Sequence, residues 1–473
     1  MLRLEPVTWL FLFVFVWCVA ARTPAGAQAL DKDRSQWSAG VARADITPQT
    51  PLWPAGYAAR TQPTEEALHP LWVKALALED GDGNRALLVT SDILGFPKAM
   101  SDSIRDRIEQ MHGLTRAQII LSASHTHGAP VIANSLRCIY PYDAEEEARL
   151  MAYAVEMEER IVALAGEALA TLEPAMLFAG NGIARFAVNR RNNAERDLVS
   201  TSTLAGPQDH AVPTLKVARG DGALIAVVFG YACHATVLAD STWSGDYPGF
   251  AQLALEEVYP DATAMFFAGC GADQNPLPRR TAALAQQYGR TLAAAVMRVL
   301  GEDMRPLEGR LETAYREVVL ELEEAPNADT LRERVANAGG YERSCNQWLL
   351  DRMEQGETLP VSYPYPVQLW RLGDQVLVTL GGEVTVPYAV GIKERFGHDA
   401  FVMGYANDLM AYIPSETILE EGGYEGKTSQ LIYGMPNVWK SGIEAKIHDA
   451  VTALYDETAL RSQGEARAGL QRP

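Results

Sequence analysis

The stretch WVKALALEDGDGNRALLVTSD, from Trp72 to Asp92, places two apolar, β-branched runs on either side of a Gly/Asp turn. This pattern predicts a β-hairpin. The same design recurs in TLKVARGDGALIAVVFGYACH (Thr214–His234) and VQLWRLGDQVLVTLGGE (Val367–Glu383). The DGDG string at Asp80–Gly83 lacks the remaining ligands and terminal glutamate of a calcium loop, so we interpret it as turn chemistry.

Helices and one further strand surround these hairpins. The apolar run Ala117–Ser124 predicts a strand that leads into His125. Helical spacing of apolar residues occupies six segments: 98–111, 144–170, 280–300, 328–337, 342–354 and 438–454. Asp143 and Thr281 are predicted helix-start residues. Because hairpins exclude a purely parallel sheet, we expect an α/β (α+β-like) fold, a mixed sheet with packed helices in one large domain.

Composition narrows the class of protein. The 473 residues are 48% hydrophobic and 21% charged, which excludes disordered, collagenous and coiled-coil chains. The formal net charge of −19, with no Lys/Arg run, makes nucleic acid an unfavourable partner and does not predict docking on anionic membranes.

The N-terminus predicts export. The apolar run Val7–Ala21 follows Arg3 and precedes the small residues Ala25–Ala27. We expect a signal peptide over residues 1–27, cleaved after Ala27, and a periplasmic or secreted mature chain without a transmembrane helix. The alternative is an uncleaved anchor, although the run is shorter than the roughly 20 residues of a spanning helix. We assign residues 28–455 to the domain and 456–473 to a loose polar tail.

Four cysteines remain after that cleavage: Cys138, Cys233, Cys270 and Cys345. In an oxidising compartment they allow three full pairings, between which the sequence does not choose. No CxxC motif is present, so a thiolate zinc site is not indicated.

Two of the eight histidines form SASHTHGAP, with His125 and His127 after the predicted strand. On a strand, residues i and i+2 share a face and lie roughly 6.6 Å apart. Two imidazoles at that spacing can bind one metal ion, or one can bind while the other moves protons. The metallo-β-lactamase pattern is not met, because Ala129 and Pro130 replace its aspartate and histidine.

Other candidates follow the later hairpins. His234 ends a buried-looking strand and is either a core side chain or a ligand. Glu383, after two glycines, is a candidate ligand or base. Asp246 in SGDYPG we interpret as a turn or helix-cap residue.

Three further segments carry polar groups with ordinary structural explanations. Tyr412 and Tyr424 lie in GYANDLMAYIPSETILEEGGYEG, and tyrosines are often half-buried core residues. Arg190 and Arg191 lie in AVNRRNN, where a charged surface is the default. The glycine-rich loop in FFAGCGADQNP contains Asn275.

The ordered set of motifs resembles the neutral/alkaline non-lysosomal ceramidase family. The set is HTH, NR, a strand ending in His, a G-x-G-x-D-x-x-P loop, GGE, and ANxxxxY followed by GGYEG. The segment GVARADITPQTPLWPAGY (Gly40–Tyr57) also resembles that family's start, so the likeness runs from about residue 40 to about residue 426.

The resemblance implies a role for each matching position. It implies one zinc ion per chain, held by His125, His234, Glu383 and Tyr412, with Tyr412 the unusual ligand. It places proton transfer and substrate contact on His127. It also places Arg190 in the site and Tyr424 beside the oxygen of the scissile amide.

Two departures from the family matter. Many ceramidases have a serine where this chain has Asn275. An amide is not a serine-type nucleophile, so Asn275 is expected to donate a hydrogen bond to substrate while zinc-activated water attacks. Second, the chain ends soon after these motifs, without the C-terminal immunoglobulin-like domain of the ceramidases.

The resemblance implies a zinc-dependent amidohydrolase that cleaves an N-acyl amide, with ceramide as one candidate small-molecule or lipid substrate. One alternative is a zinc hydrolase of an ester, a lactone or a smaller polar N-acyl compound. Another is a non-catalytic binding homologue. The sequence does not address the oligomeric state.

Overall fold

The structure, a computed structural model, describes residues 37–469, with side chains described to residue 460. The predicted signal peptide, residues 1–27, lies outside the described residues, so it stays a prediction. Over the described range, no helix is both long enough and apolar enough to cross a membrane.

A nine-stranded mixed sheet forms one half of the molecule, in the order β4-β3-β2-β1-β5-β7-β8-β9, with β11 paired to β5. Two predicted hairpins form antiparallel pairs here, β2–β3 and β7–β8, while β3–β4 and β8–β9 are parallel. The bounds are β1 (Trp37–Asp45), β2 (Trp72–Asp80), β3 (Arg85–Ser91), β4 (Ile119–Ala123), β5 (Glu173–Ile183), β7 (Ala211–Ala218), β8 (Leu224–Tyr231), β9 (Thr263–Ala268) and β11 (Arg305–Leu307).

A second, four-stranded sheet has the order β12-β13-β14-β16, and the third predicted hairpin is its β13–β14 pair. Its strands are β12 (Leu311–Glu321), β13 (Ser362–Leu372), β14 (Gln375–Leu380) and β16 (Phe401–Met403). Two small pairs lie beyond the sheets: β6 (Ala187–Asn189) with β10 (Gln274–Pro276), and β15 (Glu383–Val384) with β17 (Tyr412–Ile413).

The two sheets pack face to face. Alternate residues of β2 point to opposite sides, so Val73 joins the core under helices while Leu76 joins a core shared with Trp370 and Leu377 of the second sheet. Both faces of these strands are therefore buried, which explains why their sequences read as nearly continuous apolar runs.

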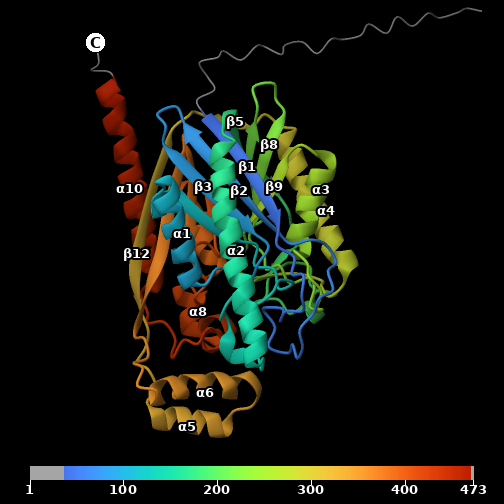
Figure 1. The fold of residues 1–473 in the computed structure, drawn as a ribbon, viewed down its shortest axis with the longest axis vertical. Helices are drawn as coiled ribbons and strands as arrows, with labels where there is room; N and C mark the ends of the chain where they lie inside the picture. The colour runs from blue at the N-terminus through green and yellow to red at the C-terminus, as the bar shows by residue number, and fades with distance from the viewer. Residues whose placement is uncertain (1–36, 470–473) are drawn as a thin grey trace, which may run out of the picture.

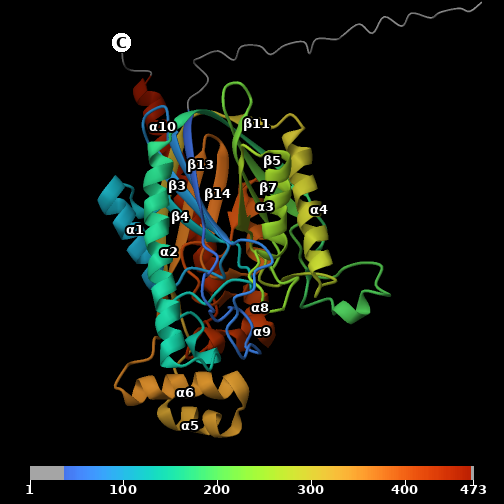
Figure 2. The same cartoon turned by 45° about the vertical axis from the view of Figure 1, so that its right-hand side comes forward.

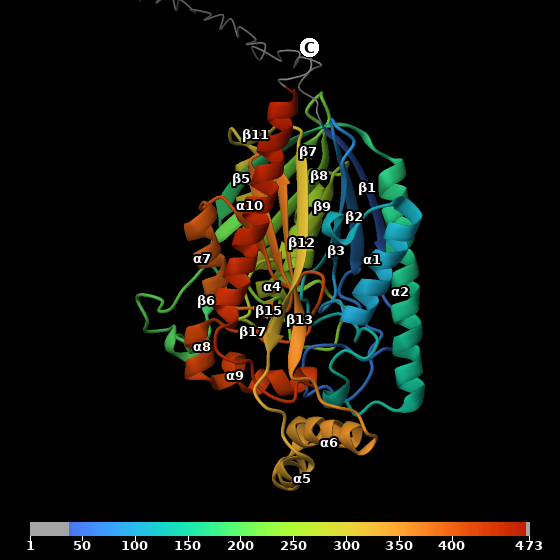
Figure 3. The same ribbon diagram turned by 90° about the vertical axis from the view of Figure 1, so that its left-hand side faces the viewer.

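Helices cover the outer faces of this sandwich. Helices α1 and α2 cover one half of the large sheet, α3 and α4 the other half, and α7 and α10 the second sheet (Figure 1). Figure 3 shows α10 lying along the second sheet. The bounds are α1 (Lys98–His112), α2 (Ala144–Ala170), α3 (Asp246–Val258), α4 (Ala282–Leu300), α5 (Ala328–Asn337), α6 (Gly340–Glu354), α7 (Val386–Phe396), α8 (Glu416–Glu421), α9 (Gly423–Gly426) and α10 (Ile443–Gly469). Four short 3₁₀ segments are η2 (Arg116–Gln118), η3 (Arg137–Ile139), η4 (Glu195–Asp197) and η5 (Thr428–Tyr433).

The predicted mixed fold is confirmed, with its three hairpins and six helices. The side chain of Asp143 accepts a hydrogen bond from the Glu146 amide at the start of α2. Thr281 does the same with the Leu284 amide at the start of α4. The first amides of a helix have no hydrogen-bond partner within the helix, and these side chains supply one. Both helix starts were therefore correctly predicted from the sequence.

The prediction of a loose tail from residue 456 is wrong for the part that the structure describes. Helix α10 continues to Gly469. The residues after Leu454 include good helix formers such as Glu, Ala and Arg. Thr458 is buried and accepts a hydrogen bond of 3.0 Å from Arg371 Nε.

A disulfide joins Cys138, in η3, to Cys345, in α6. It ties the α5–α6 pair, which projects below the sheets in Figure 1, to the main body. Cys233 and Cys270 are buried free thiols, and burial raises the pKa of both.

Candidate metal centre

The HTH motif forms a tight loop after β4 and is not part of a strand. Strand β4 ends at Ala123, and His125 adopts a left-handed backbone with φ of 57°. The expectation that His125 and His127 share a strand face is therefore wrong. Their rings instead meet nearly edge to face, with centroids 5.1 Å apart.

His125 and His234 present the same nitrogen to one point. His125 Nδ1 lies 2.7 Å from the carbonyl of Leu94, and His234 Nδ1 lies 2.9 Å from the carbonyl of Gly271. Because a carbonyl only accepts, each Nδ1 carries the ring proton, and each Nε2 of a neutral ring offers a lone pair. This arrangement fixes the tautomer that a metal-binding histidine needs.

Glu383 lies between these two rings. Its Oε2 is 3.2 Å from His125 Nε2 and 3.0 Å from His234 Nε2. The preceding Gly382 has φ of 74°, and a Cβ there would lie 2.7 Å from the carbonyl oxygen of Ala411. Only glycine therefore permits the chain reversal that brings the carboxylate to the end of β14.

The local charges favour a bound cation. Burial lowers the pKa of His234 to about 4, so that ring is neutral at pH 7. Burial raises the pKa of Glu383, but the adjacent His125 and His234 lower it by more, so its carboxylate stays ionised. Positive charge between these side chains therefore keeps the carboxylate ionised, and a bound cation would supply that charge.

The buried polar atoms identify the same point. His125 Nε2, Glu383 Oε2 and both ring nitrogens of His127 are buried without a hydrogen-bond partner among the described residues. His125, His127 and His234 also bring ligand atoms within 4.8 Å of one another, close enough to hold a metal ion. A nitrogen/oxygen donor set of this kind suits zinc.

His127 occupies the open side of this cluster. Its ring lies 4.7 Å from that of Tyr57, and a Cβ on Gly56 would lie 2.2 Å from its Nδ1. Burial lowers its pKa well below the usual value, and the neighbouring His125 and His234 lower it further. His127 is therefore a neutral imidazole able to accept and return a proton.

Tyr412 lies beside Glu383 because β15 and β17 pair in parallel with these two residues opposite each other. Its hydroxyl is 3.5 Å from His234 Nε2 and accepts a 3.2 Å hydrogen bond from Arg190 Nη2. Burial raises its pKa well above 10, with the Glu383 charge adding to the effect and Arg190 opposing it. The cation beside the phenol lowers the cost of charge on this oxygen.

Arg190 links the remaining predicted residues. Its Nε donates to Glu425 of α9 at 2.7 Å and its Nη1 to the Asn275 side-chain oxygen at 3.4 Å. Helix α9 lies in the lower half of the molecule, above α6 (Figure 2). The Tyr424 ring lies 5.3 Å from that of Tyr412. A hollow of about 480 Å³ opens at this point, lined by Arg190, Arg191, Asn275, Tyr424 and Glu425.

One segment ties the two histidine loops together. Ser244 accepts at its carbonyl from Thr126 Oγ1, at 2.6 Å, and its amide donates to the carbonyl of Gly128. The carboxylate of Asp246 accepts from the amides of Val237 and Leu238, after His234. Asp246 is thus a structural residue, as its sequence context indicated.

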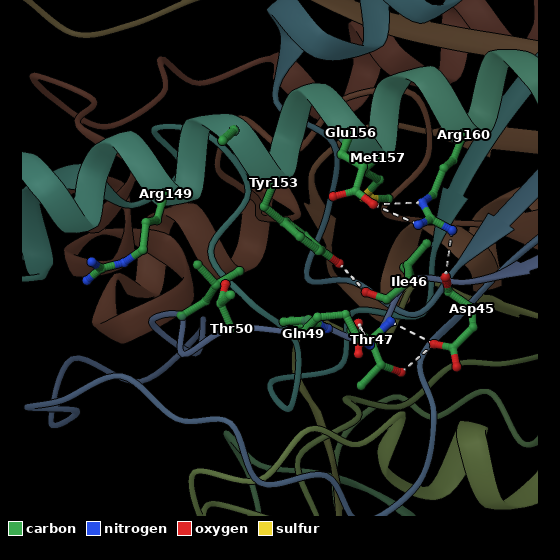
Figure 4. A pocket seen from close by; sticks show the side chains of 13 residues that line it. Asp45, Ile46, Thr47, Gln49, Thr50, Arg149, Tyr153, Glu156, Met157 and Arg160 are labelled. Atoms are coloured by element: carbon green, nitrogen blue, oxygen red, sulfur yellow. Dashed lines mark hydrogen bonds and ion pairs between the residues drawn. The ribbon is translucent and has the colours of Figure 1, made fainter.

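A larger hollow, of about 520 Å³, lies between α2 and the segment after β1, and none of its lining residues belongs to the histidine cluster (Figure 4). Its polar groups have partners: Tyr153 donates to the Ile46 carbonyl, and Arg160 to Glu156 and the Asp45 carbonyl. With no unpartnered reactive group, it offers less chemistry than the smaller hollow beside Tyr412.

The structure brings all eight predicted site residues to one end of the sheets, although their assigned roles stay predictions. Three contacts of the site were not predicted from the sequence. Tyr433 donates a hydrogen bond to Glu383 Oε1, Glu425 binds Arg190, and the ring of Tyr405 lies 4.2 Å from that of His125. Glu425 was visible within GGYEG, but nothing in the sequence around Tyr433 indicated its role.

Comparison with known proteins agrees with this geometry. The family model for the N-terminal region of neutral/alkaline non-lysosomal ceramidases matches residues 37–276. The fold is similar to the crystal structure of neutral ceramidase from Pseudomonas aeruginosa, with a TM-score of 0.64 and 18% identity over 84% of this chain and 73% of that one. A structure described as ceramidase complexed with C2 gives a TM-score of 0.63 and 19% identity over 86% and 77% of the two chains. No curated protein sequence is significantly similar to this chain.

Proposed function

Because the chain belongs to the neutral/alkaline non-lysosomal ceramidase family, we propose that it is an exported, zinc-dependent amidohydrolase that cleaves an N-acyl amide. The observation that carries the proposal is the position of Glu383 Oε2, 3.2 Å and 3.0 Å from two imidazole nitrogens whose lone pairs face it. A single cation at this point would accept the lone pairs of both imidazoles and of the carboxylate together, whereas one proton pairs the carboxylate with only one of the two rings.

We assign His125, His234 and Glu383 as the residues that hold zinc, with Tyr412 as the fourth candidate. Bound zinc would supply Lewis-acid polarisation of the scissile carbonyl and a water of lowered pKa. Tyr433 orients the ligand set through its hydrogen bond to Glu383 Oε1, which leaves Oε2 directed at the histidines.

His127 is the proton carrier of this proposal. Its two nitrogens have no hydrogen-bond partner in the part of the chain that the structure describes, and its ring is neutral. It can therefore take a proton from the attacking water and deliver it to the leaving nitrogen. Replacement of this ring therefore removes the acid that the amine needs in order to leave.

The polar residues around Tyr412 handle the carbonyl side. Tyr424 can donate a hydrogen bond to the developing oxyanion. Arg190 keeps its charge beside Tyr412 and holds the side-chain oxygen of Asn275. That contact leaves the amide NH2 of Asn275 as the donor to substrate.

The test is metal analysis of the mature chain from residue 28, followed by hydrolysis of N-acyl sphingosines, N-acyl amino acids and esters. We expect about one zinc per chain and turnover of at least one amide. Lack of stoichiometric metal, or unchanged turnover in His125→Ala, would overturn the proposal. A large gain in ceramide turnover in Asn275→Ser would identify Asn275 as the determinant of substrate choice.

A further inference from the structure

A buried histidine outside the histidine cluster, His69, is hydrogen-bonded at both ring nitrogens. It lies in the segment before β2 and is 8% exposed. Its ring packs against α3, with its centroid 4.9 Å from that of Phe250. Its Nδ1 lies 3.0 Å from the carbonyl of Pro70, and its Nε2 lies 3.2 Å from the hydroxyl of Ser244. The ring therefore joins the start of β2 to the segment that leads into α3.

The direction of these hydrogen bonds follows from their partners. The Pro70 carbonyl only accepts, so Nδ1 of His69 carries the ring proton and Nε2 is left as an acceptor. The Ser244 hydroxyl oxygen already accepts from the amide of Asp246, at 3.0 Å. The proton of that hydroxyl is therefore donated to His69 Nε2. Burial lowers the pKa of His69, so the ring is neutral at pH 7 and this acceptor is available.

Ser244 holds the residues on either side of His127. Its carbonyl accepts from Thr126 Oγ1 at 2.6 Å, and its amide donates to the carbonyl of Gly128 at 2.8 Å. The position of the loop that carries His127 therefore depends on this serine, whose side chain is held in turn by His69.

The turn that contains Ser244 also supports the second histidine loop. Asp246 has a left-handed backbone, with φ of 53°. A residue other than glycine keeps this strained conformation only where its surroundings hold it, and the Ser244 hydroxyl binds its amide. The Asp246 carboxylate accepts from the amides of Val237 and Leu238, which follow His234. An anchor on Ser244 thus serves both loops.

The space for the His69 ring depends on a glycine. A Cβ on Gly249, in the first turn of α3, would lie 2.4 Å from His69 Cε1. Two carbon atoms do not approach this closely without a bond, so an alanine there would displace the ring. The absence of a side chain at Gly249 therefore lets the imidazole reach Ser244.

We propose that His69 is a positioning residue for amide hydrolysis: through Ser244 it holds His127 where that ring can carry protons. This inference rests on the proposed function. A misplacement of about 1 Å, even from a change far from the chemistry, can cost about 10²-fold in rate. Because His69 acts through Ser244 and not on the substrate, we expect its loss to lower kcat and to leave KM nearly unchanged.

The test compares His69→Phe, which keeps a ring but loses the acceptor, with His69→Gln, which can supply an acceptor. On the N-acyl sphingosine or N-acyl amino acid that wild type hydrolyses, we expect kcat of His69→Phe to fall about 10- to 100-fold. KM and zinc content should stay nearly unchanged, and His69→Gln should recover part of kcat. In a Ser244→Ala background, His69→Phe should have almost no further effect. His448→Phe is the matched control, because that half-buried histidine stacks on Tyr388 and lies on α10.

Hydrogen exchange supplies a readout that needs no substrate. In metal-free protein, the amides of residues 125–130 and of Ser244 should exchange at least about tenfold faster in His69→Phe than in wild type, and at the wild-type rate in His448→Phe. If His69→Phe does not fold, Gly249→Ala displaces the ring without removing it and should change kcat and exchange in the same direction.

The outcomes separate the two proposals. If kcat or the exchange of this loop is unchanged, or if His69→Phe costs as much in the Ser244→Ala background as in wild type, the inference is wrong and the amidohydrolase function stands. If zinc-loaded wild type hydrolyses no amide, the proposed function is wrong, and the role of His69 in it falls as well, even where exchange shows that His69 holds the loop.

Discussion

Two buried polar regions of this protein differ in how completely their hydrogen bonds are made. Lys74, 1% exposed, donates from Nζ to Gln252, Glu256 and the carbonyl of Ala264 at 2.7–3.0 Å. In the histidine cluster, His125 Nε2 and Glu383 Oε2 have no hydrogen-bond partner among residues 37–469. Because buried polar groups are normally satisfied, the first region is complete as folded, whereas the second keeps unsatisfied atoms at the point where the proposed metal would bind.

The largest expected effect comes from Glu383→Gln. We expect kcat/KM to fall at least about 10³-fold, comparable with loss of transition-state charge stabilisation. The metal-free variant should melt higher than metal-free wild type, because an amide NH2 can donate to an imidazole nitrogen that the carboxylate cannot satisfy. Turnover assays and calorimetry of chelator-treated protein measure the two changes. A variant that melts lower without metal would contradict the comparison.

Lys74→Met tests the completed region. Without Lys74, the buried Gln252 Oε1 and the carbonyl of Ala264 lose this donor, and of its two ion pairs Glu256 keeps only the one with Arg43. We therefore expect a loss of about 3–5 kcal/mol in the free energy of unfolding. Zinc stoichiometry at 25 °C should stay unchanged, because Lys74 contacts no residue of the histidine cluster. Denaturant unfolding and metal analysis check the pair of results; loss of zinc from folded Lys74→Met would show that the regions are coupled.

The carboxylate of Asp408 is intermediate between the two regions in how completely its hydrogen bonds are made. Its Oδ2 accepts a hydrogen bond from the Tyr363 hydroxyl at 2.6 Å, but no described residue donates to its buried Oδ1. Burial raises its pKa to about 7. Between about pH 4 and 7 the carboxyl group of Asp408 is therefore protonated in the folded state but ionised in the unfolded state. The free energy of unfolding falls as pH rises through this window.

Asp408→Asn should remove that dependence. We expect the variant to gain up to about 4 kcal/mol over wild type at pH 8 and almost nothing at pH 4. Unfolding curves at four or five pH values measure this. A gain that is the same at pH 4 and pH 8 would exclude a proton on Asp408 as the cause.

The smallest effect is expected from Tyr433→Phe, which removes the donor to Glu383 Oε1 and keeps the ring. Loss of a contact that orients a metal ligand typically lowers metal affinity about 10–100-fold. Tyr363→Phe is the control, because its hydroxyl binds Asp408. Zinc competition titrations compare the zinc affinities of the two variants. Equal affinities would show that Tyr433 does not orient Glu383 for metal binding.

Much of the fold was predictable because it follows local rules. The hairpin at Trp72–Asp92 and the caps at Asp143 and Thr281 depend on residues that are close in sequence. The packing of two sheets was not predictable, since alternation in β2 shows that both faces are buried but not what covers each. The predicted end of helix α10 at Leu454 was too early, because a polar composition is typical both of exposed helices and of loose tails.

The candidate site divides in the same way. His234 and Glu383 were predictable, because each lies three residues after the end of a strand of a predicted hairpin, β8 and β14. Tyr433 was not, because its position depends on a contact between segments distant in sequence. The left-handed backbone of His125 arises from the loop that Ser244 holds, which no local pattern reports.

The most direct test of the central claim is the zinc content of purified wild type and of a His125→Ala/His234→Ala double variant, measured under conditions where both are folded. We expect about one zinc per wild-type chain and almost none in the double variant. A folded wild type that binds no zinc when it is supplied, or a variant that keeps a full equivalent, would contradict the account.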